Sequence, residues 1–150
     1  MSAVSENVVA PRVGIDPRGP QFTAVVTMLV LLAVLATAGT WVATVLTAVQ
    51  AGLFALGAGL GVQRTPVAAL FKVAVRPRLA PPVELEDPAP PRFAQAVGLV
   101  FAATALAAFV AGADTVGIVA IGFALVAATL NAVFRFCLGC ELYLLIKRFA

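Results

Sequence analysis

Residues 19–63 read GPQFTAVVTMLVLLAVLATAGTWVATVLTAVQAGLFALGAGLGVQ and contain no charged side chain. A helix needs about 20 apolar residues to cross a bilayer, so this stretch is long enough for two crossings. Gly39 and Thr40 interrupt it near its middle, where a tight turn fits. The stretch therefore predicts a helix hairpin with spans at about 22–38 and 41–62, and places Trp41 at a membrane interface.

Two further uncharged stretches follow, one between Arg92 and Asp114 and one between Asp114 and Arg135. They predict a second hairpin, with spans at about 93–111 and 115–134. The composition agrees, because 62% of the residues are hydrophobic and 11% are charged, with a mean hydropathy of +1.06, whereas soluble domains are about 25% charged. The expected fold class is therefore an all-α integral membrane protein, with four transmembrane helices in a single membrane domain over residues 1–150.

The segment before the first span returns before the third. Residues 16–22 read DPRGPQF and residues 87–93 read DPAPPRF, with Asp, two prolines and Phe at matching positions. The separation is 71 residues, the difference between 87 and 16, and it also relates Arg64 to Arg135, Phe71 to Leu142 and Arg76 to Lys147. We expect two parallel helix-hairpin repeats, at about 16–80 and 87–150, related by an axis along the membrane normal.

A short helix is expected after each hairpin. In the first repeat, Thr65 can cap such a helix and Pro66 suits its first position. Val67, Leu70, Phe71 and Ala74 then have the spacing of one helical face. This pattern predicts a short amphipathic helix on the cytosolic face, lying among lipid headgroups, with a solvated loop as the alternative.

The basic residues set the expected orientation. All ten lie before the first span, between the second and third, or after the fourth. Because Lys and Arg are enriched on the cytosolic side, we expect a multi-pass protein of the plasma membrane with both termini cytosolic. The charges are not gathered on one stripe with aromatic residues, so nucleic acid is not an expected partner.

The chain contains no histidine, and its only serines are Ser2 and Ser5. Neither a Ser-His-Asp nor a Cys-His arrangement can therefore be assembled from one chain. The lipid bilayer is the expected partner, and a homo-oligomer is compatible with the sequence. Whether the protein is an enzyme is left open.

The two cysteines, Cys137 and Cys140, stand in Cys-x-x-Cys spacing directly after the fourth span. Such a pair can cycle between dithiol and disulfide, carry sulfane sulfur or share a metal ion, and passive packing is the fourth alternative. Cytosolic thiols are kept reduced, which argues against a permanent structural disulfide. Structural zinc needs four ligands and hence two chains, so neither a metal nor a cofactor is expected.

Cys137 is the candidate attacking thiol and Cys140 the candidate resolving thiol. If Cys137 opens a helix, free helix amides and Arg135 favour its thiolate, whereas Cys140 stands beside Glu141. The sequence leaves open whether the fourth span ends before the pair. Gly139 favours a break.

Two polar residues within the spans are weaker binding candidates, Asn131 in the fourth and Gln50 in the second. Polar side chains at such depth either line a path or bond a neighbouring helix. Gly57 and Gly61 have the Gly-x-x-x-Gly spacing that permits close helix approach.

Several motifs carry a resemblance to a known family. They are Asp16 to Phe22, Val75-Arg76-Pro77-Arg78-Leu79, Glu84-Leu85-Glu86-Asp87-Pro88, and Asn131-Ala132 leading to Phe136-Cys137-Leu138-Gly139-Cys140-Glu141-Leu142-Tyr143. Together they resemble the actinobacterial membrane family catalogued as domain of unknown function 4395, over nearly the whole chain. The resemblance supports the topology and the cysteine motif and implies no reaction.

The ending is also similar, more distantly, to the Phe-Cys-Pro-x-Tyr of membrane domains attached to rhodanese sulfurtransferases, and only Cys137 carries that likeness. Three functions are compatible with these features. The first is a membrane-anchored dithiol that exchanges disulfide or sulfane sulfur with a cytosolic rhodanese-like or thioredoxin-like partner. The second is a small oligomeric channel or exporter for a sulfur-containing anion. The third is a scaffold that docks a partner through Glu84, Glu86 and Asp87.

Overall fold

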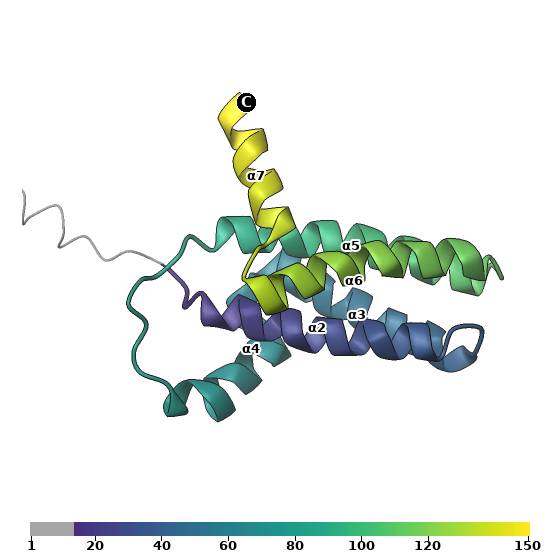
Figure 1. Cartoon of the computed structure of the whole chain (residues 1–150), viewed down its shortest axis with the longest axis horizontal. Helices are drawn as coiled ribbons and strands as arrows, with labels where there is room; N and C mark the ends of the chain where they lie inside the picture. Colours follow the sequence, from purple (N-terminus) through teal and green to yellow (C-terminus); the bar gives the residue numbers. More distant parts are fainter. Residues whose placement is uncertain (1–13) are drawn as a thin grey trace, which may run out of the picture.

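A computed structural model describes residues 14–150, and the amino terminus, predicted to be cytosolic, lies outside these residues. Four long helices share one long axis (Figure 1). They are α2 (Arg18–Ala36), α3 (Trp41–Leu60), α5 (Ala89–Val110) and α6 (Asp114–Phe134). Each is long and apolar enough to cross a membrane. The prediction of a helical chain with four apolar spans is confirmed for the described part of the chain.

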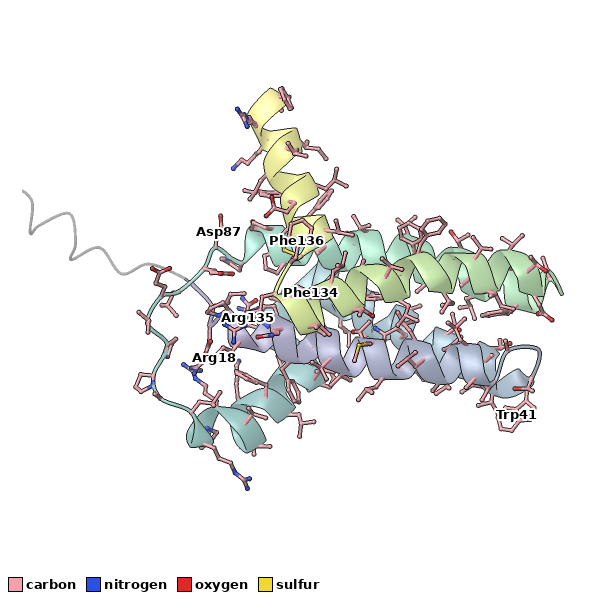
Figure 2. The ribbon with its side chains drawn as sticks, in the orientation of Figure 1. Arg18, Trp41, Asp87, Phe134, Arg135 and Phe136 are labelled. Carbon is pink, nitrogen blue, oxygen red and sulfur yellow. A yellow bond between two sulfur atoms is a disulfide. The ribbon has the colours of Figure 1, made fainter. Side chains whose placement is uncertain are left out.

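Two tight turns join the helices in pairs. Gly39 connects α2 to α3 with a φ of +84°, and Gly112 connects α5 to α6 with a φ of +83°. Glycine suits both turns because it adopts positive φ at little cost. We call the end of the bundle with these turns the turn end and the opposite end the basic end. Trp41 lies at the turn end, away from Arg18 and Arg135 (Figure 2).

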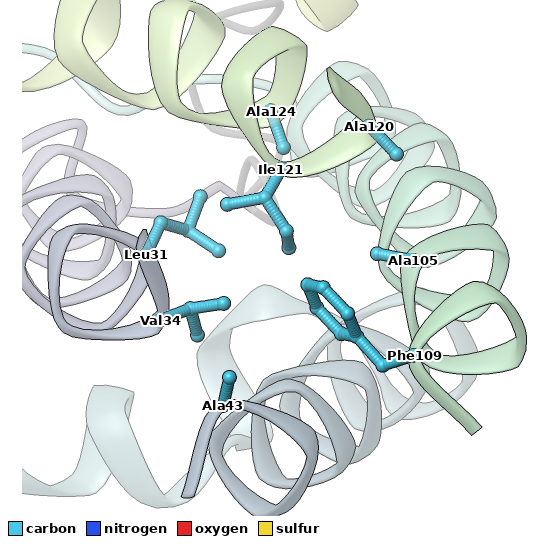
Figure 3. Close-up of a cluster of buried hydrophobic side chains, with 8 residues drawn as sticks. All are labelled: Leu31, Val34, Ala43, Ala105, Phe109, Ala120, Ile121 and Ala124. Carbon is cyan, nitrogen blue, oxygen red and sulfur yellow. The ribbon is translucent and has the colours of Figure 1, made fainter. Parts of the chain in front are cut away.

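The two hairpins interlock. Helix α3 packs most extensively against α5, and α2 packs against α6, so each helix contacts a helix of the other hairpin. A buried cluster fills the half of the bundle near the turn end (Figure 3). It consists of Leu31, Val34, Ala43, Ala105, Phe109, Ala120, Ile121 and Ala124.

Glycines allow large side chains to approach the neighbouring helices. A Cβ atom on Gly98 would lie 2.7 Å from the Phe54 ring, and one on Gly57 would lie 2.5 Å from the Gln95 side chain. Small residues are typical of helix contacts in membranes, where packing replaces the hydrophobic effect. Gly57 thus makes the predicted close approach, whereas Gly61 ends α3 with a φ of +105°.

Short helical turns leave the basic end of α3. These are the 3₁₀ turn η1 (Val62–Arg64), α4 (Pro66–Leu70), the π-helical turn η2 (Phe71–Val75) and the 3₁₀ turn η3 (Arg76–Arg78). As predicted, Thr65 caps α4, accepting the Ala68 N–H at 3.1 Å, and Pro66 is its first residue. The predicted apolar face is divided, because Phe71 is buried against Phe22 while Leu70 is exposed. The amphipathic character of this segment stays a prediction.

The segments that lead into α2 and α5 are joined at the basic end. Ile15 and Glu86 exchange two backbone hydrogen bonds of 2.9 Å, each N–H donating to the other carbonyl. Next to this bridge, the buried Asp16 accepts hydrogen bonds from the Arg18 guanidinium at 2.8 and 3.0 Å. The same guanidinium donates to the Ala80 carbonyl at 2.9 Å and so holds the linker against α2.

We expect Asp16→Asn to lower the stability of the protein by about 1–2 kcal/mol at pH 7, because it removes the charge from these hydrogen bonds. The side-chain hydrogen bond from Arg18 lowers the pKa of Asp16 from its ordinary value, although burial opposes this. The carboxylate therefore stabilises the fold above the pKa of an unfolded aspartate, about 3.9. That stabilisation is lost as the pH falls through the lower folded value.

Thermal unfolding in detergent at pH 7 and at successively lower pH values measures the difference between the variant and the wild type. The matched control is Asp87→Asn, because the exposed Asp87 only accepts the Ala89 N–H, which an amide oxygen can also do. An equal loss of stability in both variants would contradict the prediction.

Candidate functional site

The fourth span ends before the cysteine pair, which decides the question that the sequence leaves open. Helix α6 stops at Phe134, and Arg135 adopts the left-handed conformation with φ 57° and ψ 27°. The Arg135 N–H donates to the Asn131 carbonyl and the Phe136 N–H donates to the Leu130 carbonyl, both at 3.1 Å. These bonds satisfy two carbonyls near the end of the helix, and the first is the bond of the αL motif, in which the left-handed residue donates to the carbonyl four residues earlier.

Cys137 opens the last helix, α7 (Leu138–Phe149). It is the N-cap residue, in extended conformation, and its Sγ accepts the Cys140 N–H at 3.2 Å. A disulfide joins Cys137 to Cys140, whose Cα atoms are 5.1 Å apart. That separation lies in the ordinary range for disulfides, so the extended cap and the first helical turn bring the two sulfurs into bonding reach.

Helix α7 is anchored on the first turns of α5. A Cβ atom on Gly139 would lie 2.6 Å from Cα of Ala94, and the rings of Tyr143 and Phe93 are 5.6 Å apart. Gly139 is therefore present because the two backbones approach closely. The break that Gly139 favoured in the sequence is present, but it lies at Arg135, and Gly139 itself is the second residue of α7.

A cavity of about 730 Å³ occupies the basic half of the bundle, between α2, α5, α6 and α7. Toward the basic end its lining includes charged residues and the disulfide, namely Arg18, Glu86, Asp87, Arg135, Glu141, Cys137 and Cys140. Deeper in the bundle its lining includes Phe54, Phe101 and Phe123, and uncharged polar residues also border it, namely Gln21, Thr27, Gln95 and Asn131. The buried cluster near the turn end closes the bundle beyond it.

The family model described as Domain of unknown function (DUF4395) matches residues 15–148. The chain belongs to this family. The resemblance seen in the sequence is thus confirmed, and the match covers both hairpins and the cysteine pair of the DUF4395 chain. No curated protein and no solved structure matches it.

The DUF4395 chain brings most of the predicted site residues to one cavity. Cys137, Cys140, Arg135 and Asn131 all line it. Gln50 does not, because it is buried between α3 and α2, where its Nε2 donates to Thr27 Oγ1 at 3.4 Å. Of the two alternatives for Gln50, the structure has the bond to a neighbouring helix.

Sequence reasoning missed Gln21 and Gln95, which also line the cavity. Both are amides within the first two turns of an apolar helix, and this position could have marked them in the sequence as candidates for a polar contact. Gln21 donates through Nε2 to the Ala132 carbonyl at 3.1 Å and so ties α2 to the end of α6. Among residues 14–150, no group of three or more His, Cys, Asp or Glu side chains is placed to hold a metal ion.

We expect Gly139→Ala to destabilise the docking of α7 by about 1–3 kcal/mol, because the new methyl group meets backbone that cannot move aside. Thermal unfolding and the alkylation rate of the reduced cysteines measure this, and displacement of α7 should raise the rate. The matched control is Gly122→Ala in α6, where a Cβ atom meets nothing within 4 Å. The prediction fails if the two variants behave alike.

Proposed function

We propose that this DUF4395 chain is a plasma-membrane protein whose Cys137–Cys140 pair exchanges disulfide or sulfane sulfur with a cytosolic thioredoxin-like or rhodanese-like protein. One observation carries the proposal. The pair lies outside the apolar helices, in the first turn of α7, and borders a cavity of the bundle. It is therefore accessible to water-borne partners while attached to a membrane scaffold.

The charge distribution supports a cytosolic location for the pair. Arg18 and Arg135 mark the basic end, which Figure 2 shows opposite Trp41. Trp41 is 75% exposed, as expected for a residue at the other membrane interface. Because Lys and Arg favour the cytosolic side, the basic end, with both cysteines, faces the cytosol in our proposal.

The orientation of α7 supports a position at the membrane surface. The helix projects from the basic end across the bundle axis (Figure 1). One side of it exposes Leu138, Leu142, Leu145, Ile146 and Phe149, at the spacing of a single helical face. An apolar face without a protein partner is stabilised by acyl chains when a helix lies among headgroups. In our proposal α7 lies there and holds the disulfide at that depth.

We also infer that the scaffold is a tandem duplication, and a reciprocal contact supports it. Ile15 and Glu86, which exchange two backbone hydrogen bonds, occupy equivalent positions at the repeat separation of 71, the difference between 86 and 15. A contact between equivalent residues across a two-fold axis is reciprocal in this way. Asp16 and Asp87, also equivalent, each accept the backbone N–H two residues further on.

A second pair of equivalent contacts lies between the hairpins. Gln21 and Arg92 are equivalent at the same separation. Gln21 donates to the Ala132 carbonyl near the end of α6, and Arg92 donates to the Ala58 and Gly59 carbonyls at the end of α3. Each repeat thus caps the second helix of the other, which supports a parallel repeat about an axis along the membrane normal.

The proposed exchange begins with the reduced pair. The Cys140 N–H that Cys137 Sγ accepts favours the Cys137 thiolate, as at other helix amino termini. This thiolate attacks a partner disulfide, forms a mixed disulfide and releases a partner thiolate. The Cys140 thiolate then attacks Cys137 Sγ, which closes the internal disulfide and releases the second partner thiolate. With a partner persulfide, Cys137 takes the sulfane sulfur, and closure by Cys140 releases hydrosulfide.

A purely structural disulfide is disfavoured by the length of the loop that it closes. Cys137 and Cys140 are three residues apart. In the chain-entropy account, stabilisation grows with the length of the closed loop and reaches about 3 kcal/mol for 15 residues. The bond thus adds less to the stability of the fold than a long-range one, which supports a chemical role.

The packed turn end weakens the channel alternative. Leu31, Val34, Phe109 and Ile121 fill the bundle beyond the cavity. An anion crossing a single chain would have to displace this buried cluster, which is close-packed in a folded bundle. The exchange function needs no path through the membrane.

We expect Cys140→Ser to accumulate a mixed disulfide with a thioredoxin-like protein, because Cys137 attacks and no resolving thiol remains. Cys137→Ser is the matched control and should form about tenfold less adduct, since it lacks the thiolate at the helix start. Non-reducing gels and mass spectrometry of sealed inside-out vesicles measure the adduct. Equal amounts of adduct in both variants would contradict the proposal. So would adduct that forms only when the partner is supplied at the outer face of the membrane.

Arg135→Gly tests the thiolate-stabilising role proposed for Arg135. Glycine suits the left-handed conformation and should stabilise the turn by up to about 1 kcal/mol. Loss of the guanidinium should slow alkylation of Cys137 below neutral pH, because less thiolate is present. Arg64→Gly, at the equivalent repeat position, is the control. Alkylation of Cys137 at the wild-type rate in Arg135→Gly would exclude the role.

A further inference from the structure

We propose that the cavity binds a membrane-soluble quinone, which accepts two electrons from the reduced Cys137–Cys140 pair. The inference rests on the redox role proposed for the cysteines and adds the electron acceptor. Three observations carry it: the contact of both cysteines with the cavity, its aromatic and uncharged interior, and its amide groups.

The size and position of the cavity suit a small amphipathic ring. Its volume of about 730 Å³ lies within the range of about 300–1,000 Å³ that is typical of small-molecule sites. It lies inside a bundle of four membrane-length helices, so a ligand dissolved in the bilayer is near it at all times. Phe54, Phe101 and Phe123 supply rings on which a flat ring can pack.

The distribution of charge favours a neutral ligand. The charged residues that line the cavity belong to its end near the basic termini of the helices, where Arg18 is already paired with Asp16. Deeper in the bundle the lining is apolar or uncharged. An anion placed there would lose its hydration without a paired cation, at a cost of several kcal/mol. A quinone ring carries no charge.

Three amide side chains on the cavity can donate hydrogen bonds to the carbonyl oxygens of a quinone. Gln21, Gln95 and Asn131 are half-buried on the cavity. Each amide carries two N–H donors, and quinone carbonyl oxygens are acceptors. The hydrogen bond from Gln21 to the Ala132 carbonyl uses one of its donors, which leaves the other for a ligand.

Disulfide exchange is reversible, so the disulfide form of the pair can also accept two electrons from a reduced thioredoxin-like partner. The dithiol that results needs an oxidant before it can act again, and glutathione and thioredoxin do not supply one, because they keep cytosolic thiols reduced. Quinones of the bilayer are such acceptors for protein dithiols. The location of the pair, between the cavity and the aqueous surface, fits electron transfer from a soluble protein to a lipid-soluble carrier.

The reaction balances with the quinone as the only added reactant. One cysteine thiolate adds to a ring carbon of the quinone and forms a C–S bond. The second thiolate attacks that sulfur, the C–S bond breaks, and its electron pair passes to the ring. The two protons of the thiols end on the two oxygens, so dithiol and quinone become disulfide and hydroquinone.

The test uses the purified full-length chain, reduced, freed of reductant and kept without oxygen, with decylubiquinone as the probe. We expect disulfide and hydroquinone in equal amounts, measured by mass spectrometry after alkylation and by absorbance. Ala127→Phe, which fills the cavity, should slow the reaction by about tenfold or more, because the ring loses its near-attack position. Ala107→Phe, on an exposed position of α5 that does not line the cavity, should leave the rate unchanged.

Equal rates in the wild type and Ala127→Phe would mean that thiols and quinone react in free solution, which overturns the proposal. Should Ala127→Phe fail to fold, photo-crosslinking of an azidoquinone to the wild type decides. Labels on the peptides with Gln95 or Asn131 support the site, and labels only on the lipid-facing surface overturn it.

The same samples separate this inference from the exchange function. Hydroquinone formation without exchange with a thioredoxin-like or rhodanese-like protein would contradict the proposed exchange function and leave the quinone proposal standing. Exchange without hydroquinone formation would contradict the quinone proposal alone.

Discussion

The fold depends on the satisfaction of backbone hydrogen bonds inside hydrocarbon. No water is available there, so a spanning segment keeps every N–H and C=O within its own helix. In residues 14–150 the chain leaves this pattern only at the two ends of the bundle. At the turn end two glycines reverse the chain within a few residues. All longer irregular segments therefore gather at the basic end, and the cysteines with them.

Packing divides the bundle into two unlike halves. Near the turn end, small residues let the helices approach, and Ile121 and Leu31 are fully buried. Toward the basic end the helices are held by polar contacts of their termini, such as the bonds from Gln21 and Arg92 to carbonyls of the opposite hairpin. These contacts fix the positions of the helix ends without filling the space between them. A cavity beside a rigid set of termini is the result.

The positions of the apolar helices and the start of α4 were predictable from the sequence, and the contacts between helices were not. The charge-free stretches located the four apolar helices, and Thr65 followed by Pro66 located the start of α4. The sequence left open whether the helix of the fourth span continues into the cysteine pair, because the break falls on Arg135, in a left-handed position that usually holds glycine. Gly139 was taken only as a sign of a break, because its close contact with Ala94 joins segments that are distant in the sequence and leaves no local pattern. The cavity depends on the same long-range packing, so sequence could indicate Asn131 and the cysteines as candidates without showing that they meet.

The two short helices that follow the hairpins are capped by different side chains. Thr65 begins α4 and Cys137 begins α7, and each side chain accepts the N–H three residues ahead. A hydroxyl oxygen is a good acceptor and threonine is a favoured cap, whereas sulfur is a weak acceptor. Cysteine is thus the poorer choice for the structural task that both residues perform. What it adds is a sulfur held at a helix amino terminus, within bonding reach of a second sulfur and in contact with the cavity. The proposed exchange would use this sulfur, whereas the hydroxyl of Thr65 serves only as a cap.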